Sequence, residues 1–241
     1  MNLSGNTILI TGGTSGIGLA LGKYFLAKNN KVILLGRNQS KLGQLQKEGF
    51  EALRCDLSNQ KDIEETIKMV EQQFDHLNVL INNAGIQYNY LFPEIAIPFK
   101  SIEEEIEINV TGQMVFTQLL IPILAAKPKA FIINTTSALG AFPKKDALVY
   151  SASKAAFRNF TQGLRITLKN TSIKIMEFIP PVTETNMTEG RLGKKISPEE
   201  LISKIIPQMK NEKELLTTIP VRAFLWIAFL FPGIAEKILS K

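Results

Sequence analysis

Short apolar runs alternate with longer segments of helical periodicity through the first three quarters of the chain. The apolar runs predict six strands, near residues 7–11, 31–36, 51–55, 79–82, 130–134 and 174–178. The segments between them predict helices near residues 17–27, 40–47, 60–74, 102–126 and 150–168. Strands that are joined by helices of this length form parallel sheets through right-handed crossovers. The pattern therefore predicts an α/β fold, a doubly wound parallel sheet with helices on both faces.

The pattern loosens after Pro180. A loop that contains Thr, Asn and Gly reaches Ser197, where Ser-Pro-Glu-Glu supplies an N-cap, a first-turn proline and acidic residues for a further helix. No repeat, low-complexity tract or linker divides the chain, so we expect one domain over residues 1–241. Residues 1–185 form the expected cofactor-binding and catalytic core, and residues 186–241 form the expected substrate lid and apolar C-terminal helices.

An apolar stretch over residues 215–235 carries one charge, Arg222. Pro220 and Pro232 leave an uninterrupted helix of about 11 residues, roughly half of what a ~30 Å hydrocarbon core requires, so we predict no spanning helix here. Three roles stay open for this stretch. It completes the core, which is the favoured role, or it forms a dimer face, or residues 221–239 contact a membrane surface.

Composition narrows the function classes. Of 241 residues, 45% are apolar and 21% are charged, which is typical of a folded domain. The single cysteine, Cys55, forms no intramolecular disulfide and is expected in the core, and the first residues show no signal peptide, so we expect a cytoplasmic protein. One histidine, His76, argues against a His-based metal site or a Ser-His-Asp triad. The net charge of +6 includes no basic tract, so no nucleic-acid partner is predicted.

A glycine-rich loop joins the first predicted strand to the first helix. It is Thr11-Gly12-Gly13-Thr14-Ser15-Gly16-Ile17-Gly18. Gly12 permits a tight turn, Gly16 permits close approach to a pyrophosphate, and Gly18 permits close packing of the helix on the strand. The helix N-terminus offers unpaired N–H groups to the anion. This placement predicts dinucleotide binding by Gly12, Thr14, Ser15, Gly16, Ile17 and Gly18.

The second strand ends without the acidic residue that would accept hydrogen bonds from an adenosine ribose. Gly36 leaves space there, and Arg37 supplies a planar cation that can hold a 2′-phosphate, with Lys41 as support. Arg37 is alternatively a solvated loop residue. We favour NADP(H) over NAD(H) as the cofactor. At the end of the third strand, Asp56 and its neighbour Leu57 are expected beside the adenine, whose amino group can donate a hydrogen bond to the Asp56 carboxylate.

A phenol and an amine lie four residues apart, at Tyr150 and Lys154, and hence on one face of the predicted helix. A neighbouring ammonium and an oxidised nicotinamide ring would stabilise the phenolate, which would bring the pKa of Tyr150 closer to neutrality for acid–base work. Ser137 follows the fifth strand, at the sheet edge where ligands bind in open α/β folds.

Together these motifs resemble the short-chain dehydrogenase/reductase family in its compact, single-domain form. Thr11 to Gly18 matches its glycine loop, Asn82-Asn83-Ala84-Gly85 matches its Asn-Asn-Ala-Gly motif, and Asn109, Ser137, Tyr150 and Lys154 match its catalytic residues. The resemblance implies a Rossmann fold in which Tyr150 exchanges a proton with the substrate oxygen and Ser137 hydrogen-bonds that oxygen. It also implies that Lys154 holds the nicotinamide ribose and lowers the Tyr150 pKa, and that Asn109 anchors a relay water.

Several of these residues have an alternative role that is structural and not catalytic. Asn109 alternatively satisfies backbone groups in a helix kink, and Ser137 is alternatively a turn hydroxyl, with Thr136 as the neighbour most easily mistaken for it. Asn83, Ala84 and Gly85 are expected in the wall beside the adenosine and ribose.

The turn Pro180-Pro181-Val182-Thr183-Glu184-Thr185 is similar to the family's Pro-Gly turn, whose backbone and threonine hold the carboxamide. The resemblance implies that Pro180, Thr183 and Thr185 contact the cofactor here. Pro181 replaces the glycine, so this turn has one N–H donor fewer than the family's turn. A closer resemblance, through residues 2–7, residues 77–87 and the Pro-Pro turn, is to bacterial oxidoreductases named for D-alanine esterification of teichoic acid. That label concerns genetic context and identifies no substrate.

Three loops above the sheet, residues 86–99, 138–148 and 186–195, are expected to select the substrate. The Tyr, Phe and Leu residues of these loops favour an apolar or cyclic carbonyl compound as the substrate, or alternatively pack the lid on the core. Lys144 and Lys145 either contact an anionic substrate or form a solvated turn. We predict an NADP(H)-dependent carbonyl reductase or alcohol dehydrogenase that acts on a small molecule and forms a homo-oligomer. The alternative is a catalytically idle, dinucleotide-sensing partner protein. Epimerase chemistry is disfavoured because too little chain follows Thr185 for a nucleotide-sugar domain.

Overall fold

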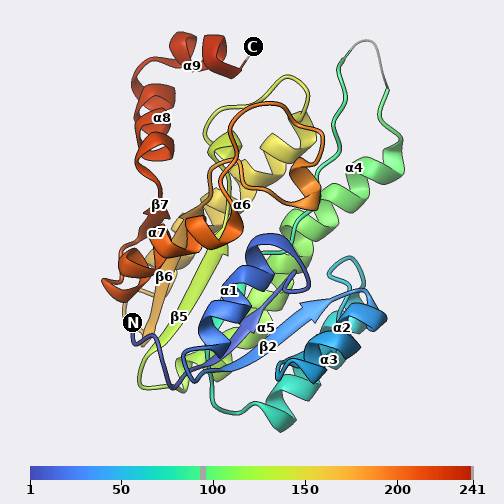
Figure 1. The fold of residues 1–241 in the computed structure, drawn as a ribbon, viewed down its shortest axis with the longest axis vertical. Helices are drawn as coiled ribbons and strands as arrows, with labels where there is room; N and C mark the ends of the chain where they lie inside the picture. Colours follow the sequence, from blue (N-terminus) through green and yellow to red (C-terminus); the bar gives the residue numbers. More distant parts are fainter. Residues whose placement is uncertain (93–95, 240–241) are drawn as a thin grey trace.

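Seven parallel strands form one sheet in the order β3-β2-β1-β4-β5-β6-β7. They are found in a computed structural model that describes residues 1–92 and 96–239 (Figure 1). The strands are β1 (Thr7–Ile10), β2 (Lys31–Gly36), β3 (Glu51–Arg54), β4 (Leu77–Asn82), β5 (Ala130–Thr135), β6 (Ile173–Ile179) and β7 (Leu215–Thr217). The doubly wound parallel sheet is confirmed, and the six predicted strands are present within two residues of their expected bounds.

Helices cover both faces of the sheet. They are α1 (Gly16–Leu26), α2 (Gln39–Lys47), α3 (Gln60–Gln73), α4 (Phe99–Ile106), α5 (Gly112–Ala125), α6 (Leu148–Thr167), α7 (Pro198–Lys210), α8 (Ile219–Leu230) and α9 (Pro232–Leu239). Alternate side chains of the strands divide the core in two. One half packs against α1 and α7, with Ile8 and Phe25 inside it. The other packs against α3, α5 and α6, with Leu9 and Phe116 inside it. Burial on both faces explains why these strands are almost wholly apolar.

The helix predicted over residues 102–126 consists of α4, a π-helical turn η1 (Glu107–Thr111) and α5. A π turn holds one residue more than an α turn, and such turns are frequent at functional sites. The sequence pattern did not predict this irregularity. By length and composition, the run 99–125 is long and apolar enough to cross a membrane. Its Phe116, Leu120 and Leu124 are buried between α5 and the sheet, as in the core helix of a globular domain.

The segment after residue 185 contributes more to the domain than a lid. Ser197 caps α7 as predicted, since its side chain accepts a hydrogen bond from the Glu200 N–H at 3.1 Å. Leu201 and Ile205 of α7 and Leu216 of β7 then lie in the core beside β6. The division at residue 185 is therefore not a structural boundary. Strand β7 was missed because its three residues lie inside a longer apolar stretch.

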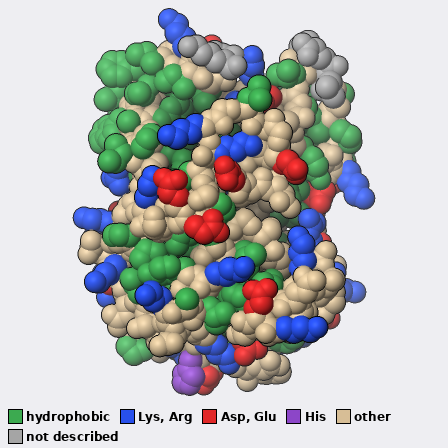
Figure 2. Space-filling model, in the orientation of Figure 1, with side chains coloured by type: hydrophobic (Ala, Val, Ile, Leu, Met, Phe, Trp, Pro, Cys, Tyr) green, Lys and Arg blue, Asp and Glu red, His purple; other side chains and the backbone are tan. Residues whose placement is uncertain are grey.

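Helices α8 and α9 lie at one end of the molecule, and hydrophobic side chains gather over them (Figure 2). Trp226, Phe229 and Phe231 are exposed, whereas only Val221 and Ala235 of the two helices are buried. The favoured expectation, that this stretch completes the core, is therefore wrong for most of it. The physical reason is that α8 leaves the sheet after β7 and packs mainly against α9, so within the described residues no further layer covers most of its side chains. A dimer face, membrane contact and a cytoplasmic location stay predictions.

Candidate functional site

A cavity of about 1660 Å³ lies at the carboxyl ends of the strands. Nearly all of the predicted site residues line it. They are Gly12, Thr14, Ser15, Gly16, Ile17, Arg37, Asp56, Leu57, Asn83, Ala84, Gly85, Ser137, Tyr150, Lys154, Pro180, Thr183 and Thr185. Gly18 and Asn109 do not line it. The motifs that the sequence spreads over 174 positions thus meet in one space, as the sheet-edge argument predicts.

The glycine loop has the geometry of an anion cradle. Gly12 and Gly16 have positive φ angles of 63° and 53°, a region that L side chains rarely adopt. A Cβ at Gly16 would lie 2.9 Å from the Cγ2 of Thr185, so the two sides of the cavity approach each other here. Ser15 caps α1 in an extended conformation without using its side chain on its own helix. Its hydroxyl and the first N–H groups of α1 fit a pyrophosphate.

The glycine loop is held to the end of β4 by hydrogen bonds. The Thr11 hydroxyl accepts from the N–H groups of Asn83 and Ala84 at 2.9 and 3.0 Å. The Asn83 amide donates to the carbonyls of Thr11 and Gly12, both at 3.3 Å. A Cβ at Gly18 would lie 2.4 Å from the Gly12 carbonyl oxygen and 2.6 Å from the Asn83 amide nitrogen. Gly18 therefore supports the cradle from behind and does not line the cavity.

The part of the cavity beside Arg37 and Asp56, where the sequence predicts the adenosine, contains charges of both signs. The Arg37 guanidinium lies 3.4 Å from a carboxylate oxygen of Glu104 and 3.9 Å from one of Asp56. The other Asp56 oxygen accepts from the Ser58 N–H and hydroxyl. Gly36 has no room for a side chain, because a Cβ there would lie 2.4 Å from Thr14. Arg37 thus lies where predicted, and a 2′-phosphate would compete with Glu104 for its guanidinium. Cys55, next to Asp56, is buried as expected, and burial raises the pKa of its thiol to about 11.

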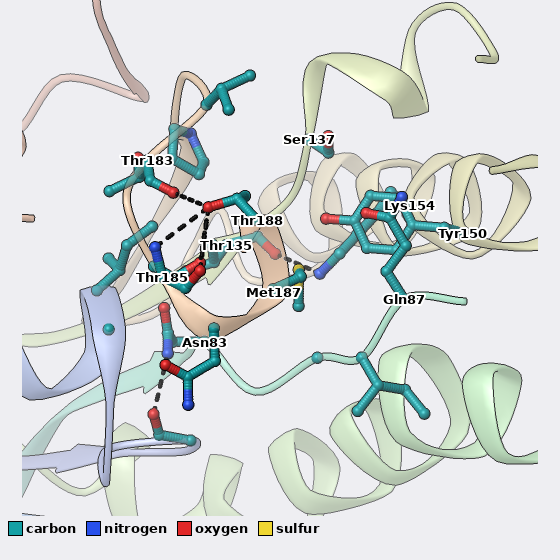
Figure 3. A pocket seen from close by; sticks show the side chains of 18 of the residues that line it. Asn83, Gln87, Thr135, Ser137, Tyr150, Lys154, Thr183, Thr185, Met187 and Thr188 are labelled. Carbon is teal, nitrogen blue, oxygen red and sulfur yellow. Dashed lines mark hydrogen bonds between the residues drawn. The ribbon is translucent and has the colours of Figure 1, made fainter. Parts of the chain in front are cut away.

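Tyr150 and Lys154 lie side by side on α6, with Ser137 on the facing strand end (Figure 3). The Lys154 ammonium donates to the Thr135 carbonyl at 3.1 Å and lies 5.7 Å from the centre of the Tyr150 ring. Ser137 is the hydroxyl that faces the cavity. The hydroxyl of the alternative residue, Thr136, is buried and donates to Glu177 at 2.7 Å. Ser137 also caps a short turn through the Leu139 N–H.

Burial controls the titration of this pair. Burial raises the pKa of Tyr150 to about 12, against the opposing effects of the Ser137 hydrogen bond and the Arg191 charge. Burial also lowers the pKa of Lys154 to about 8, while the negative charge of Glu105 opposes that shift. Lys154 is not among the causes that act on the Tyr150 pKa here, and the lowering expected from the ammonium together with an oxidised nicotinamide ring stays a prediction. The ammonium lies over the ring and is bonded to a carbonyl, so it does not offset the desolvation of the hydroxyl.

Asn109 lies in the π turn η1 and joins three elements. Its side-chain oxygen accepts from the Ile86 N–H at 2.8 Å, and its amide donates to the Ile86 carbonyl and the Ser153 hydroxyl. The bonds to Ile86 are of the kind expected if Asn109 satisfies backbone groups at a helix kink. Gly85 separates Asn109 from the Lys154 ammonium, with contacts of 3.2 and 3.4 Å for an added Cβ.

The Pro-Pro turn is braced from within. Thr188, in the 3-10 turn η3 (Asn186–Thr188), donates through its hydroxyl to the carbonyls of Thr183 and Thr185, and accepts from the Thr185 N–H at 3.1 Å (Figure 3). Thr183 itself donates to the Pro181 carbonyl at 2.9 Å. Thr188 thus fixes the turn that Pro181 deprives of an N–H donor, a role that the sequence analysis did not assign.

Two further charged residues near Tyr150 were missed. Glu105 is almost wholly buried on α4, and burial raises the pKa of its carboxyl to about 7. It lies four residues before Asn109, a spacing that could have placed both on one helix side. Arg191 lies in the loop after η3, between Gly190 and Gly193, and lines the cavity. Its flanking glycines were the available signal.

Comparison with known proteins identifies related chains. A family model described as short chain dehydrogenase matches residues 6–195. The uncharacterized oxidoreductase DltE of Bacillus subtilis is 32% identical over 225 residues, which cover 90% of this chain and 89% of that protein. This relative confirms the closer resemblance noted in the sequence.

Solved structures share the fold over the whole chain. A short chain dehydrogenase of Burkholderia cenocepacia in complex with NADP has a TM-score of 0.89 at 20% identity, with full coverage of both chains. A short chain dehydrogenase/reductase of Burkholderia phymatum in complex with NAD has a TM-score of 0.85 at 19% identity and covers 100% of this chain and 97% of that one.

Proposed function

The chain belongs to the short-chain dehydrogenase family of oxidoreductases, and from this premise we propose that it transfers hydride between NADP(H) and a carbonyl or alcohol substrate, with Tyr150 as acid and base. The observation that carries the proposal is the single cavity shared by the glycine loop, Ser137, Tyr150 and Lys154. A phenol, a hydroxyl and an ammonium beside a dinucleotide cradle are the groups that carbonyl reduction requires.

Each part of the cavity has a proposed partner in the cofactor. The cradle with the α1 N-terminus would hold the pyrophosphate, and Arg37 would hold the 2′-phosphate. Asp56 and Leu57 would lie beside the adenine, with Asn83, Ala84 and Gly85 in the wall. Lys154 would hold the nicotinamide ribose, and Pro180, Thr183 and Thr185 the carboxamide. When bound, the nicotinamide supplies or accepts the hydride.

Proton transfer falls to residues of this chain. With a pKa raised to about 12, Tyr150 is protonated at neutral pH, the form that donates a proton to a carbonyl oxygen during reduction. Ser137 would donate or accept a hydrogen bond at the same oxygen. Lys154, with a pKa near 8, can carry a proton at neutral pH and release it at only slightly higher pH. This combination supports carbonyl reduction as the assayed direction.

A panel of carbonyl compounds tests the proposal. We expect loss of reduced-nicotinamide absorbance with at least one class of aldehyde or ketone, and a higher kcat/KM with NADPH than with NADH. Binding of both cofactors without turnover of any carbonyl or alcohol would contradict enzymatic activity and favour the dinucleotide-sensing alternative. Preference for NADH would contradict only the role of Arg37.

A further inference from the structure

One guanidinium nitrogen of Arg191, Nη2, is buried and has no hydrogen-bond partner among the residues that the structure describes. Within residues 1–92 and 96–239, no ion pair joins Arg191 to a carboxylate. The residue lines the same cavity as Tyr150, and its charge acts on the Tyr150 phenol. A cation is thus held beside the acid–base group with part of its hydrogen-bonding capacity unused.

Most other cations around the cavity are already engaged, and Lys194, which also lines it, is exposed. Lys144 pairs with Asp146 at 2.9 Å, and Lys195 donates to the Thr188 carbonyl at 2.6 Å. Lys154 donates to the Thr135 carbonyl. Arg191 differs from Lys144, Lys154 and Lys195 because the described residues provide neither an acceptor for its Nη2 nor a carboxylate for its charge.

Desolvation makes such a group informative. A buried, unpaired N–H of a charged group loses its hydration and gains nothing in return, so it destabilises the protein until an acceptor arrives. Guanidinium groups bind carboxylates through two parallel N–H···O bonds, a geometry that matches Arg better than Lys. Arg191 is partly exposed and lines the cavity, so an anionic group of the ligand can bind its guanidinium there.

Apolar side chains form part of the remaining wall at the substrate end, the part of the cavity that holds Ser137, Tyr150 and Arg191. They include Leu139, Met187, Val221, Phe224 and Leu239. An anion at Arg191 would therefore belong to a molecule that also presents hydrocarbon to these side chains. The apolar or cyclic carbonyl compound expected from the loops 86–99, 138–148 and 186–195 stays a prediction, to which Arg191 adds a charge requirement.

We propose that the substrate is an oxo acid, whose carboxylate binds Arg191 while its carbonyl oxygen lies at Tyr150 and Ser137. This inference rests on the proposed function. In the reaction, the C=O π bond breaks, the carbonyl carbon receives the hydride, and Tyr150 gives its proton to the oxygen. The products are a hydroxy acid and the oxidised nicotinamide, so two electrons leave the cofactor and two enter the carbonyl group.

The test compares oxo acids of six to ten carbons with their methyl esters, which keep the carbonyl and remove the charge. For the unmodified protein we expect a kcat/KM at least tenfold higher for the acid. Arg191→Met should raise the KM for the acid at least tenfold, while the KM for the ester stays within about twofold and NADPH affinity is unchanged. Because the Arg191 charge also acts on the Tyr150 phenol, any change in kcat should be the same for the acid and the ester. Arg191→Lys should recover part of the loss, because it restores a charge without the planar fork.

Arg222→Met is the matched control, since Arg222 is exposed on α8 and does not line the cavity. It should leave both substrates unaffected. Equal kcat/KM for acids and esters, an equal loss for both in Arg191→Met, or weakened NADPH binding in that variant would overturn the inference while the proposed function stands. If the protein turned over neither the acids nor the esters, nor any other carbonyl compound, the proposed function itself would be rejected.

Discussion

The two ends of the cavity are completed in different ways. At the cofactor end, polar groups bond to one another, as Thr11 does with Asn83 and Ala84. At the substrate end, Arg191, Asp146 and Thr218 each keep a buried polar atom without a partner in the described part of the chain. The first arrangement has its backbone braced within the chain and leaves the Ser15 hydroxyl and the first N–H groups of α1 for a ligand. The second depends on side-chain atoms for which the described residues provide no hydrogen-bond partner.

The two ends of the cavity therefore differ in the kind of sequence feature that encodes them. A dinucleotide cradle uses backbone N–H groups and glycine conformations, which many sequences can encode with one short motif. A substrate site uses side chains from loops whose contacts depend on the ligand. We therefore expect substitutions at the two ends to act on separate kinetic constants, and the following experiments test that separation.

The largest effect is expected for Tyr150→Phe, which removes the proton donor and little else. We expect kcat to fall about 10²–10⁴-fold, the range of a positioned acid, while NADPH affinity changes less than about twofold. Steady-state oxidation of NADPH and a fluorescence titration of NADPH binding measure the two quantities.

Tyr24→Phe is the control for this variant, because Tyr24 packs beside Phe25 on α1, away from the cavity lining. If Tyr150→Phe kept more than a tenth of the wild-type kcat, Tyr150 would not be the acid. If it instead lost NADPH binding, the two ends would not be separable.

A smaller effect is expected for Arg37→Met at the opposite end. Loss of a charged hydrogen bond to a 2′-phosphate should weaken NADPH binding about tenfold and leave NADH binding and the carbonyl KM unchanged. The guanidinium already pairs with Glu104 and Asp56, so the effect should be below that of an unpaired arginine. Parallel KM measurements with both cofactors decide it, and an equal change for NADH would rule out a phosphate contact.

The smallest effect concerns stability and Glu105, which lies between the helix that carries Tyr150 and the loop after β4. Because burial raises its pKa to about 7, the folded protein keeps this proton up to a higher pH than the unfolded chain does. The stability contributed by the protonated carboxyl is complete below about pH 4.5 and is lost as the pH rises through about 7.

Glu105→Gln should remove about 1–3 kcal/mol of this decline in the free energy of unfolding between about pH 5 and 8. Urea unfolding across that interval measures it. Glu103→Gln, at an exposed position on the same helix, should leave the pH dependence unchanged. Parallel curves for Glu105→Gln and the wild type would show that the carboxyl does not titrate as inferred.

Much of the fold was predictable because local signals and global packing agree. Ser197, Pro198 and Glu200 predict the start of α7, and the apolar runs predict the central strands. The glycine loop and the Tyr150–Lys154 spacing predict groups that do meet in one cavity. These signals depend on backbone geometry over a few residues, which a sequence displays directly.

The remaining features depend on contacts between distant segments. The π turn at Asn109 becomes visible only when Ile86 and Ser153 are placed beside it. The high pKa of Tyr150 follows from burial, which residue spacing does not reveal. The exposure of α8 contradicts an expectation drawn from hydrophobicity alone, because an apolar residue is buried only when another layer covers it.

The π turn between α4 and α5 also fixes the rotation of α4 about the helix axis relative to α5. Each residue advances an α-helix by about 100°, so deleting one residue within Glu107–Thr111 would convert the turn to regular helix and rotate α4 by about that angle. Glu105 would then leave its buried position and Glu104 would turn away from Arg37. The length of this short segment, as much as its residue types, therefore sets which carboxyl groups reach the two ends of the cavity.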